Sequence, residues 1–184
     1  MATVALPKCE SPWDDDEHYE VINGHRVKTP RMGTYETLIA SIINHVLGSF
    51  ARTNRLGRVV VEMLFLIEAA TGLKRRPDLA FVSYDRWPRN RRPGPNDAWD
   101  VVPDLAVEVI SPTNRADEVQ EKILDYFRTG VRLVWVIYPN QRQVYVYDAP
   151  TRIRVLQDGD ELDGADVIPG FRMPLKALFD EEAE

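Results

Sequence analysis

The chain has 184 residues, of which 44% are hydrophobic and 28% charged, a length and composition typical of a single globular domain. It contains no apolar run long enough to cross a membrane, and its first seven residues lack the basic start and apolar core of a secretory signal. A single cysteine, Cys9, excludes a disulfide framework, and the three histidines lack the spacing of zinc ligands. We therefore expect a cytoplasmic protein with no membrane segment.

The net charge of −6 is unevenly distributed along the chain. Residues 1–20 carry −5 and residues 148–184 carry −6, whereas residues 21–147 carry +5. The central part could therefore face a polyanion while the two ends repel one. Alternatively, the acidic ends only keep the protein soluble, and composition leaves both interpretations open.

The first 17 residues are acidic and show no periodicity, which predicts a flexible acidic tail over 1–17. No linker or repeat divides the rest of the chain, so we expect one domain over 18–180. Within residues 18–29, the pair Asn23-Gly24 separates two short alternating runs. Both turn residues of a tight hairpin need positive φ, which Asn and Gly tolerate, so this segment predicts an N-terminal β-hairpin.

From Thr34 to about Arg52, apolar side chains recur at spacings of three and four residues, which predicts an amphipathic helix. Glu36 falls at the edge of the apolar stripe instead of opposite it. This carboxylate either complements the helix dipole from the first turn or points toward a functional site, and the pattern alone allows both.

Two β-rich runs come next, over residues 58–69 and 74–83, and we interpret each as a strand. Asp78 stands at the start of the second strand, directly after Pro77, and a proline is tolerated at such an entrance. The segment 84–100 is rich in proline and arginine, which predicts a surface loop.

Residues 103–111 form an apolar, partly β-branched run, as expected of a strand that is covered on both faces. Glu108 lies in the middle of this run, where a carboxylate is costly unless it is paired, protonated or bound to a cation. A helix is predicted next, over residues 115–129 with Asn114 as its N-cap. Lys122 borders the apolar face of that helix, so its ammonium can reach outward.

The C-terminal third of the chain continues the sheet. The apolar run over residues 131–138 predicts a buried strand, and the alternating run over 142–147 predicts its partner. After that come short, acidic, turn-rich pieces that end in a weak helix near residues 175–179.

The connectivity predicts which carboxylates meet. Three sequential strands joined by turns most simply form an antiparallel meander, in which the start of the second strand lies beside the end of the third. This places Asp78 and Glu108 next to each other, whereas Asp104, at the start of the third strand, would lie roughly 13 Å from Glu108. The following helix folds back across the sheet and could bring Lys122 to the carboxylate pair.

Two neighbouring carboxylates repel each other unless a proton or a cation lies between them. Hard oxygen ligands suit Mg²⁺ or Mn²⁺, which can polarise a phosphoryl oxygen and activate water. An added lysine could orient that water or stabilise developing charge. The alternative is a buried Glu–Lys ion pair that serves structure alone.

Several motifs in this chain resemble those of a known family. The order of helix, three strands, helix and strand, with a Pro-Asp, a strand Glu and a nearby Lys, resembles the PD-(D/E)xK nuclease superfamily. Within it, the chain is similar to the Uma2 (DUF820) family of endonucleases over residues 18–180. The motifs are RPDLAFV over 76–82, PDLAVEVISP over 103–112, Glu121-Lys122 with Tyr126 and Gly130-Val131, and DGADVIPGF over 163–171.

The resemblance implies a restriction-endonuclease-like α/β fold, with a mixed central sheet flanked by helices and a divalent-metal phosphodiesterase site. Asp78 would be the strand-start aspartate and Glu108 the (D/E) of the motif, both as ligands of Mg²⁺ or Mn²⁺. Two residues after Glu108 the pattern asks for lysine, but this chain has Ile110. Lys122, from the next helix, is the expected substitute.

Two further acids match this pattern only in part. Glu36 could be the first-helix acid that some members of the superfamily use. Asp104 fits the sequence motif of the family but not the meander geometry. It would then hydrogen-bond the loop, or reach the metal if its strand is bulged.

The predicted function is a metal-dependent DNA endonuclease, as a homodimer because a two-fold enzyme can address both strands. Trp87 and Trp99, in the loop 84–100, would stack on bases or pack on a partner subunit. Basic residues before Asp78 and in this loop could contact phosphates. They are Lys74, Arg75, Arg76, Arg86, Arg89, Arg91 and Arg92.

Two other functions stay open at this point. One is a catalytically inactive nuclease-like fold that acts as a nucleic-acid or protein binding module, which the isoleucine at position 110 and the acidic net charge favour. The other is a metal-dependent hydrolase of a smaller phosphodiester.

Overall fold

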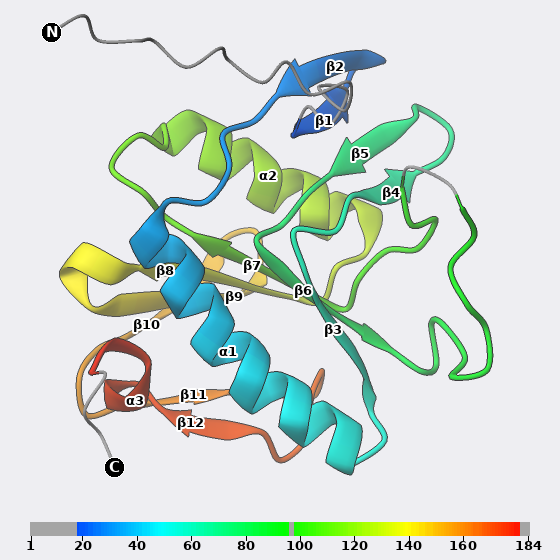
Figure 1. The fold of residues 1–184 in the computed structure, drawn as a ribbon. Coiled ribbons are helices and arrows are strands. Elements are labelled where there is room, and N and C mark those ends of the chain that lie inside the picture. The colour runs from blue at the N-terminus through cyan, green and yellow to red at the C-terminus, as the bar shows by residue number, and fades with distance from the viewer. Residues whose placement is uncertain (1–17, 96–97, 181–184) are drawn as a thin grey trace, which may run out of the picture.

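A six-stranded mixed sheet forms the centre of the structure, a computed structural model that describes residues 18–95 and 98–180 (Figure 1). The predicted acidic tail over 1–17 lies outside the described residues. The strand order is β10-β9-β8-β7-β6-β3, in which β7 and β8 are parallel and the other neighbours antiparallel. The strands are β3 (Gly57–Val61), β6 (Leu79–Ser83), β7 (Leu105–Val109), β8 (Leu133–Tyr138), β9 (Gln143–Ala149) and β10 (Arg152–Leu156).

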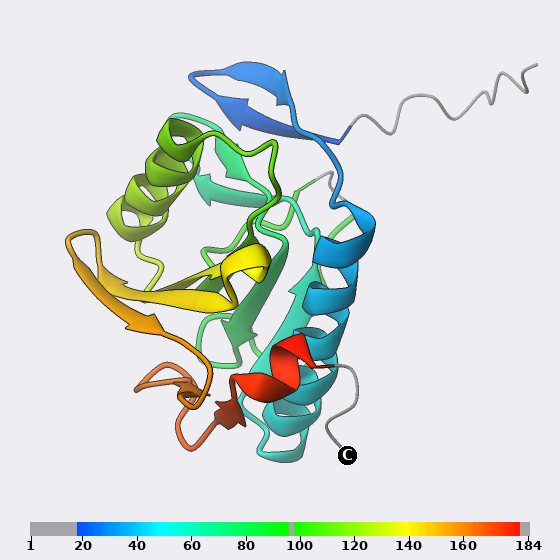
Figure 2. The ribbon, with the colours of Figure 1, turned by 90° about the vertical axis from the view of Figure 1, so that its left-hand side faces the viewer.

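Two helices cover opposite faces of this sheet (Figure 2). Helix α1 (Thr34–Thr53) packs with alternate strand residues such as Leu79 and Phe81. Helix α2 (Ala116–Thr129), the crossover between β7 and β8, packs with the residues in between, such as Ala80 and Val82. Because side chains alternate along a strand, Glu108 of β7 shares the α2 face with Ala106. The predicted α/β fold with a mixed central sheet is confirmed.

A second, four-stranded sheet contains the N-terminal hairpin, in the order β2-β1-β5-β4. Its strands are β1 (Tyr19–Ile22), β2 (His25–Lys28), β4 (Phe65–Glu68) and β5 (Leu73–Arg75). The turn residues Asn23 and Gly24 have φ values of 51° and 77°, as the hairpin prediction requires. Strand β1 pairs with β5, so the hairpin is attached directly to the chain segment that leads to Asp78.

The two β-rich runs predicted as single strands are each divided between the two sheets, which corrects the prediction. The run 58–69 breaks after β3, where Glu62 adopts a φ of 49°, and continues as β4. The run 74–83 breaks between β5 and β6, around Pro77. The sequence pattern missed both breaks because apolar and β-branched residues continue across them, whereas the chain changes direction at a single backbone position or at a proline.

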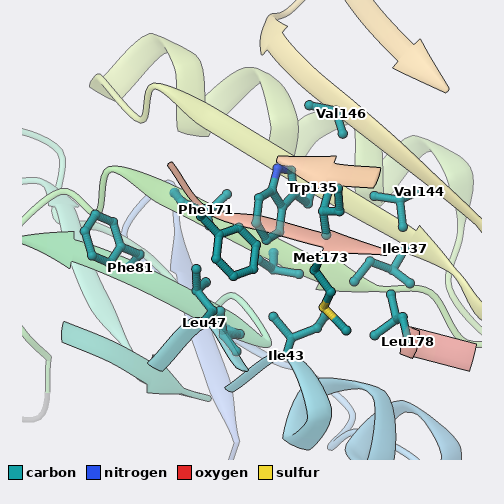
Figure 3. Packing of buried hydrophobic residues seen from close by; sticks show 14 of the residues in the cluster. Ile43, Leu47, Phe81, Trp135, Ile137, Val144, Val146, Phe171, Met173 and Leu178 are labelled. Atoms are coloured by element: carbon teal, nitrogen blue, oxygen red, sulfur yellow. The ribbon is translucent and has the colours of Figure 1, made fainter. Parts of the chain in front are cut away.

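The C-terminal segment completes the core on the α1 face. A short 3₁₀ helix, η1 (Pro139–Gln141), joins β8 to β9, and β11 (Glu161–Asp163) pairs with β12 (Arg172–Pro174) before helix α3 (Lys176–Phe179). Figure 3 shows Ile43 and Leu47 of α1 facing Met173 and Phe171 of this segment. The ring of Phe171 stacks on Trp135 at 6.0 Å between centroids. None of the described helices combines the length and apolar character that a bilayer crossing requires.

Two details predicted from the sequence are wrong. Asn114 does not cap α2: its Oδ1 accepts a hydrogen bond from the Ser111 backbone N–H, and Arg115 holds the N-cap position without a side-chain bond. Trp87 and Trp99 are buried within the chain, edge to face at 5.4 Å between centroids, and therefore offer no free surface for bases or a second subunit. The polar composition of their loop hid this packing.

Candidate active site

Asp78 and Glu108 lie side by side at one end of the central sheet. Strands β6 and β7 are antiparallel, with Leu79 opposite Val107, so the residue before β6 comes alongside the end of β7. The Val109 backbone N–H donates to Asp78 Oδ2 at 2.6 Å, which fixes the aspartate against β7. The structure thus brings together two predicted site residues that are 30 positions apart in the chain.

Glu108 is buried beneath α2, where two side chains hold its carboxylate. Lys122 Nζ donates to Glu108 Oε2 at 2.9 Å, and the Tyr126 hydroxyl donates to Glu108 Oε1 at 2.6 Å. Lys122 and Tyr126 are four residues apart and therefore lie on the same face of the helix. Tyr126 is fully buried; the sequence placed it in the family motif with Lys122 but gave it no role at the site.

The site is electrostatically unbalanced toward negative charge. Burial and the neighbouring Glu108 carboxylate raise the pKa of Asp78 from 3.8 to about 7. Burial also raises the pKa of Glu108, although the Lys122 ammonium opposes this effect. Burial alone would lower the pKa of Lys122, but Glu108 and a second carboxylate, Glu20, raise it. Lys122 is therefore protonated, and Asp78 is poised to exchange its proton for another cation.

Both carboxylates line a pocket between α1, α2 and the residues that flank the hairpin, although Glu108 itself is buried. Glu36 contributes to its wall from the first turn of α1, so the structure brings this predicted acid to the same pocket. A Cβ at Gly33 would overlap Glu36 Oε2, so a glycine is needed for the carboxylate to lie there. The lining includes His18, Arg31, Gly33, Glu36, Arg76, Asp78, Glu108, Ile110, Ser111, Asn114, Glu118 and Lys122.

Glu20, from strand β1, is a site carboxylate that sequence reasoning missed. Only 1% of the residue is exposed, and its Oε1 lies 3.3 Å from Lys122 Nζ. Its Oε2 accepts from Arg75 at 2.7 Å. The alternation of a short hairpin gives no signal that one acid is buried, because its partners, Arg75, Arg76 and Lys122, come from residues far along the chain.

Asp104 lies at the opposite end of β7 and does not line the pocket. It accepts from the Ser83 backbone N–H at 2.8 Å and pairs with Arg86 Nε at 2.9 Å. Arg86 also donates to the carbonyls of Val102, Pro103 and Gly130. Asp104 therefore ties down the loop, the first of the two roles considered for it.

The predicted phosphate-binding residues fall into separate groups. Arg75 is buried between Glu20 and Asp125, and the partly exposed Arg86 is paired with Asp104, so both hold the fold. Arg76 lines the pocket, while Lys74 belongs to β5. Of the arginines in the loop, Arg89, Arg91 and Arg92 are exposed, and the Arg91 guanidinium lies over the ring of Trp87.

These loop arginines do not flank the carboxylate pair. Arg58, near the start of β3, donates to the carbonyls of Arg89 and Arg91. The start of β3 is the end remote from Asp78, because Val61 at its other end is the residue paired with Leu79. Arg58 is four residues along β3 from Glu62, the residue beside Asp78. At the usual rise of a strand, the loop arginines that Arg58 contacts therefore lie roughly 13 Å from the carboxylate pair.

Comparison with known proteins was made on the sequence and on the fold. A family model described as "Uma2: Putative restriction endonuclease" matches residues 7–176. The chain belongs to the Uma2 family. Its fold is similar to that of a "putative nuclease belonging to DUF820" from Anabaena variabilis, with a TM-score of 0.76 at 22% identity over 88% of this chain and 89% of that one. A search of curated proteins gives no match.

In this Uma2 chain, Ile110 occupies the position where the superfamily pattern asks for lysine. Its backbone N–H donates to Ile137 of β8, and its side chain packs with the apolar cluster under α2. No ammonium can come from that position, whereas Lys122 reaches Glu108 from the helix. The structure thus places the predicted substitute lysine in contact with the motif glutamate.

The donor set of the pocket suits a hard cation only in part. Among residues 18–95 and 98–180, no three histidine, cysteine, aspartate or glutamate side chains gather closely enough to hold an ion by themselves. Asp78 and Glu108 supply carboxylate oxygens, and the pKa of Asp78 is raised first by burial and then by the neighbouring Glu108. A cation with open positions for water and substrate, such as Mg²⁺ or Mn²⁺, fits this set better than one that needs a full protein cage.

Proposed function

We propose that this Uma2 protein is a Mg²⁺- or Mn²⁺-dependent endonuclease that hydrolyses phosphodiester bonds of DNA. The observation that carries the proposal is the contact of 2.9 Å between Lys122 Nζ and Glu108 Oε2, beside Asp78 in an open pocket. It assembles two carboxylates and an ammonium from three separate elements, which is the set that the family pattern requires for phosphodiester hydrolysis.

Each residue has a distinct role in the proposed reaction. Asp78 and Glu108 would hold the divalent cation, which when bound supplies Lewis-acid polarisation of a phosphoryl oxygen. Lys122 would orient the attacking water or stabilise the charge that develops on the phosphoryl oxygens. Tyr126 holds the Glu108 carboxylate from the buried side, so that its open side faces the pocket. Glu36 would bind water or the cation from the far wall.

DNA is the proposed substrate because basic side chains accompany the acids at the pocket. Arg31 and Arg76 line it together with His18. Arg76 also donates to the Tyr19 and Glu62 carbonyls, and its remaining N–H groups could contact the phosphate next to the scissile one. The exposed arginines of the loop 84–100 would contact DNA farther along the duplex. We also propose a homodimer, which would place one such site on each strand, and a cytoplasmic location.

A binding module without catalysis is the second candidate. Lys122 is paired with both Glu108 and Glu20, an arrangement that could equally be a structural ion-pair network. Such a protein would bind nucleic acid or protein through the same pocket rim and cut neither. A hydrolase of smaller phosphodiesters differs from both in needing no duplex contacts.

Plasmid cleavage at low salt with Mg²⁺ or Mn²⁺ tests the proposal. We expect nicking that depends on the metal and that Glu108→Gln and Lys122→Gln each reduce by at least about 100-fold, since each removes a group of the reacting set. Linear product that appears together with nicks is expected of a dimer.

The matched control is Glu68→Gln, because Glu68 also pairs with a basic residue of α2, Arg128, but outside the pocket. This variant should cut like the wild type. Folded protein that does not cut with either metal, or cutting that survives both pocket substitutions, would favour the binding module. Hydrolysis of a small chromogenic phosphodiester without salt-sensitive duplex binding would favour the smaller substrate.

A further inference from the structure

Glu20 connects the N-terminal hairpin to the proposed reacting group. Its carboxylate is buried between three donors: the Arg76 backbone N–H on Oε1 at 2.9 Å, Arg75 on Oε2 at 2.7 Å, and Lys122 Nζ 3.3 Å from Oε1. The hydrogen bonds from Arg75 and Arg76 fix the plane of the carboxylate. One of its oxygens is therefore held toward Lys122 by contacts that do not involve Lys122.

Lys122 needs a second contact to fix its ammonium because it lies on a helix and not on the strand of Glu108. A lysine two residues after Glu108 would be fixed by the strand itself, but Lys122 extends from α2 on a flexible four-carbon stem. A single contact with Glu108 leaves the ammonium free to swing around that carboxylate. A second carboxylate, on a different element, restricts the ammonium to the line between the two oxygens.

Arg75 also links Glu20 to α2 through a second carboxylate. Arg75 bonds Glu20 on one side and Asp125 of α2 on the other, at 2.6 Å from Nη2 to Oδ2. Asp125 lies three residues after Lys122 on the same helix. The hairpin strand β1, the strand β5 and the helix α2 are thus joined by charged contacts at the point where Lys122 leaves the helix.

We propose that Glu20 is the positioning residue for Lys122, and that the N-terminal hairpin thereby takes the place of the strand backbone that would otherwise aim the lysine. This inference rests on the proposed function. Glu20 touches neither substrate nor cation in this role: it acts through Lys122. The competing interpretation is that Glu20 only neutralises the buried Arg75.

The test observes the Lys122 ammonium directly, by its ¹H–¹⁵N signal in the full-length protein, and measures DNA cleavage in the same preparations. Glu20→Gln keeps the size of the side chain but removes the charge that faces Lys122. Its single amide oxygen can accept from Arg75 or from the Arg76 N–H, but not from both. Asp125→Asn is the matched control, because it removes the other carboxylate bound to Arg75 without touching Lys122.

We expect the Lys122 ammonium signal to be sharp in the wild type and in Asp125→Asn, and broadened or lost in Glu20→Gln. We expect kcat for cleavage to fall about 10- to 100-fold in Glu20→Gln, the usual effect of losing a supporting contact, with KM within about two-fold of the wild type. If Glu20→Gln does not fold, Glu20→Asp, which keeps the negative charge but withdraws the carboxylate from all its partners by one methylene, carries the same expectations.

Three results would decide against parts of this scheme. An unchanged Lys122 signal in Glu20→Gln would overturn the positioning role, as would equal broadening in Asp125→Asn. A Lys122 signal that responds as expected in a protein whose wild type cuts no DNA would overturn the proposed function alone, since the contact between Glu20 and Lys122 does not depend on catalysis.

Discussion

At the scale of single residues, the ionised Asp78 carboxylate lowers the stability of the metal-free protein. Its pKa is raised in the native state, to about 7, by burial and by repulsion from Glu108. The native state therefore binds this proton more tightly than the unfolded chain does, and stability falls as pH rises from about 4 to about 7. Above pH 7 the whole cost of the ionised carboxylate is present.

Asp78→Asn should consequently stabilise the metal-free protein at pH 8 and remove this part of the pH dependence. Urea unfolding at pH 5 and pH 8 measures the effect, with Asp148→Asn on the surface as the control. A variant less stable than the wild type at pH 8 would show that the hydrogen bond from the Val109 N–H outweighs the repulsion.

At the scale of elements, the loop 84–100 depends on one carboxylate. Asp104 receives the Ser83 N–H and pairs with Arg86, whose guanidinium also binds three backbone carbonyls. Because Asp104 is buried and lies at the end of β7 remote from the pocket, we expect it to serve the fold and not the reaction.

Asp104→Ala should lower the free energy of unfolding by about 3 kcal/mol, as expected when hydrogen bonds to a buried charged group are lost. The variant that remains folded should keep the kcat of the wild type for DNA cleavage. Urea titration and the plasmid assay together check both statements. A large loss of kcat without loss of stability would instead support the alternative in which Asp104 reaches the metal.

Some elements and site residues could be predicted from the sequence, and others could not. The hairpin at Asn23-Gly24, the helix around Glu36 and the buried strand around Glu108 could be predicted because each is encoded locally, by turn residues, a helical stripe or an apolar run. Glu20 could not, because its burial depends on a strand pairing more than fifty residues away in the chain. The breaks near Glu62 and Pro77 were missed since apolar residues continue through them.

At the scale of the whole molecule, the positive charge of the central region divides into structural and exposed parts. Arg75 and Arg86 are paired with carboxylates of the fold, whereas Arg89, Arg91 and Arg92 of the loop are exposed and are the arginines that we expect to contact DNA. The loop arginines are distant from the pocket, so we expect them to contribute to binding and not to the chemical step.

Replacing Arg89, Arg91 and Arg92 together by glutamine should weaken duplex binding and lower the slope of log K against log salt by up to about 3, near 0.9 for each lost phosphate contact. Binding is measured with the Glu108→Gln protein to prevent cleavage, and Arg152→Gln, on the opposite edge strand β10, is the control. An unchanged slope would exclude the loop from the DNA interface.

The position of Lys122 on α2, and not on the strand of Glu108, changes the sequence pattern by which related chains can be recognised. A sequence pattern that demands lysine two positions after the strand glutamate does not match this chain, because position 110 is isoleucine. The contacts define another signature: glutamate in a buried strand, lysine 14 positions later and tyrosine 18 positions later, both on one face of the next helix. Chains with this spacing and an acid in an N-terminal hairpin would share the arrangement, whatever residue comes after the glutamate.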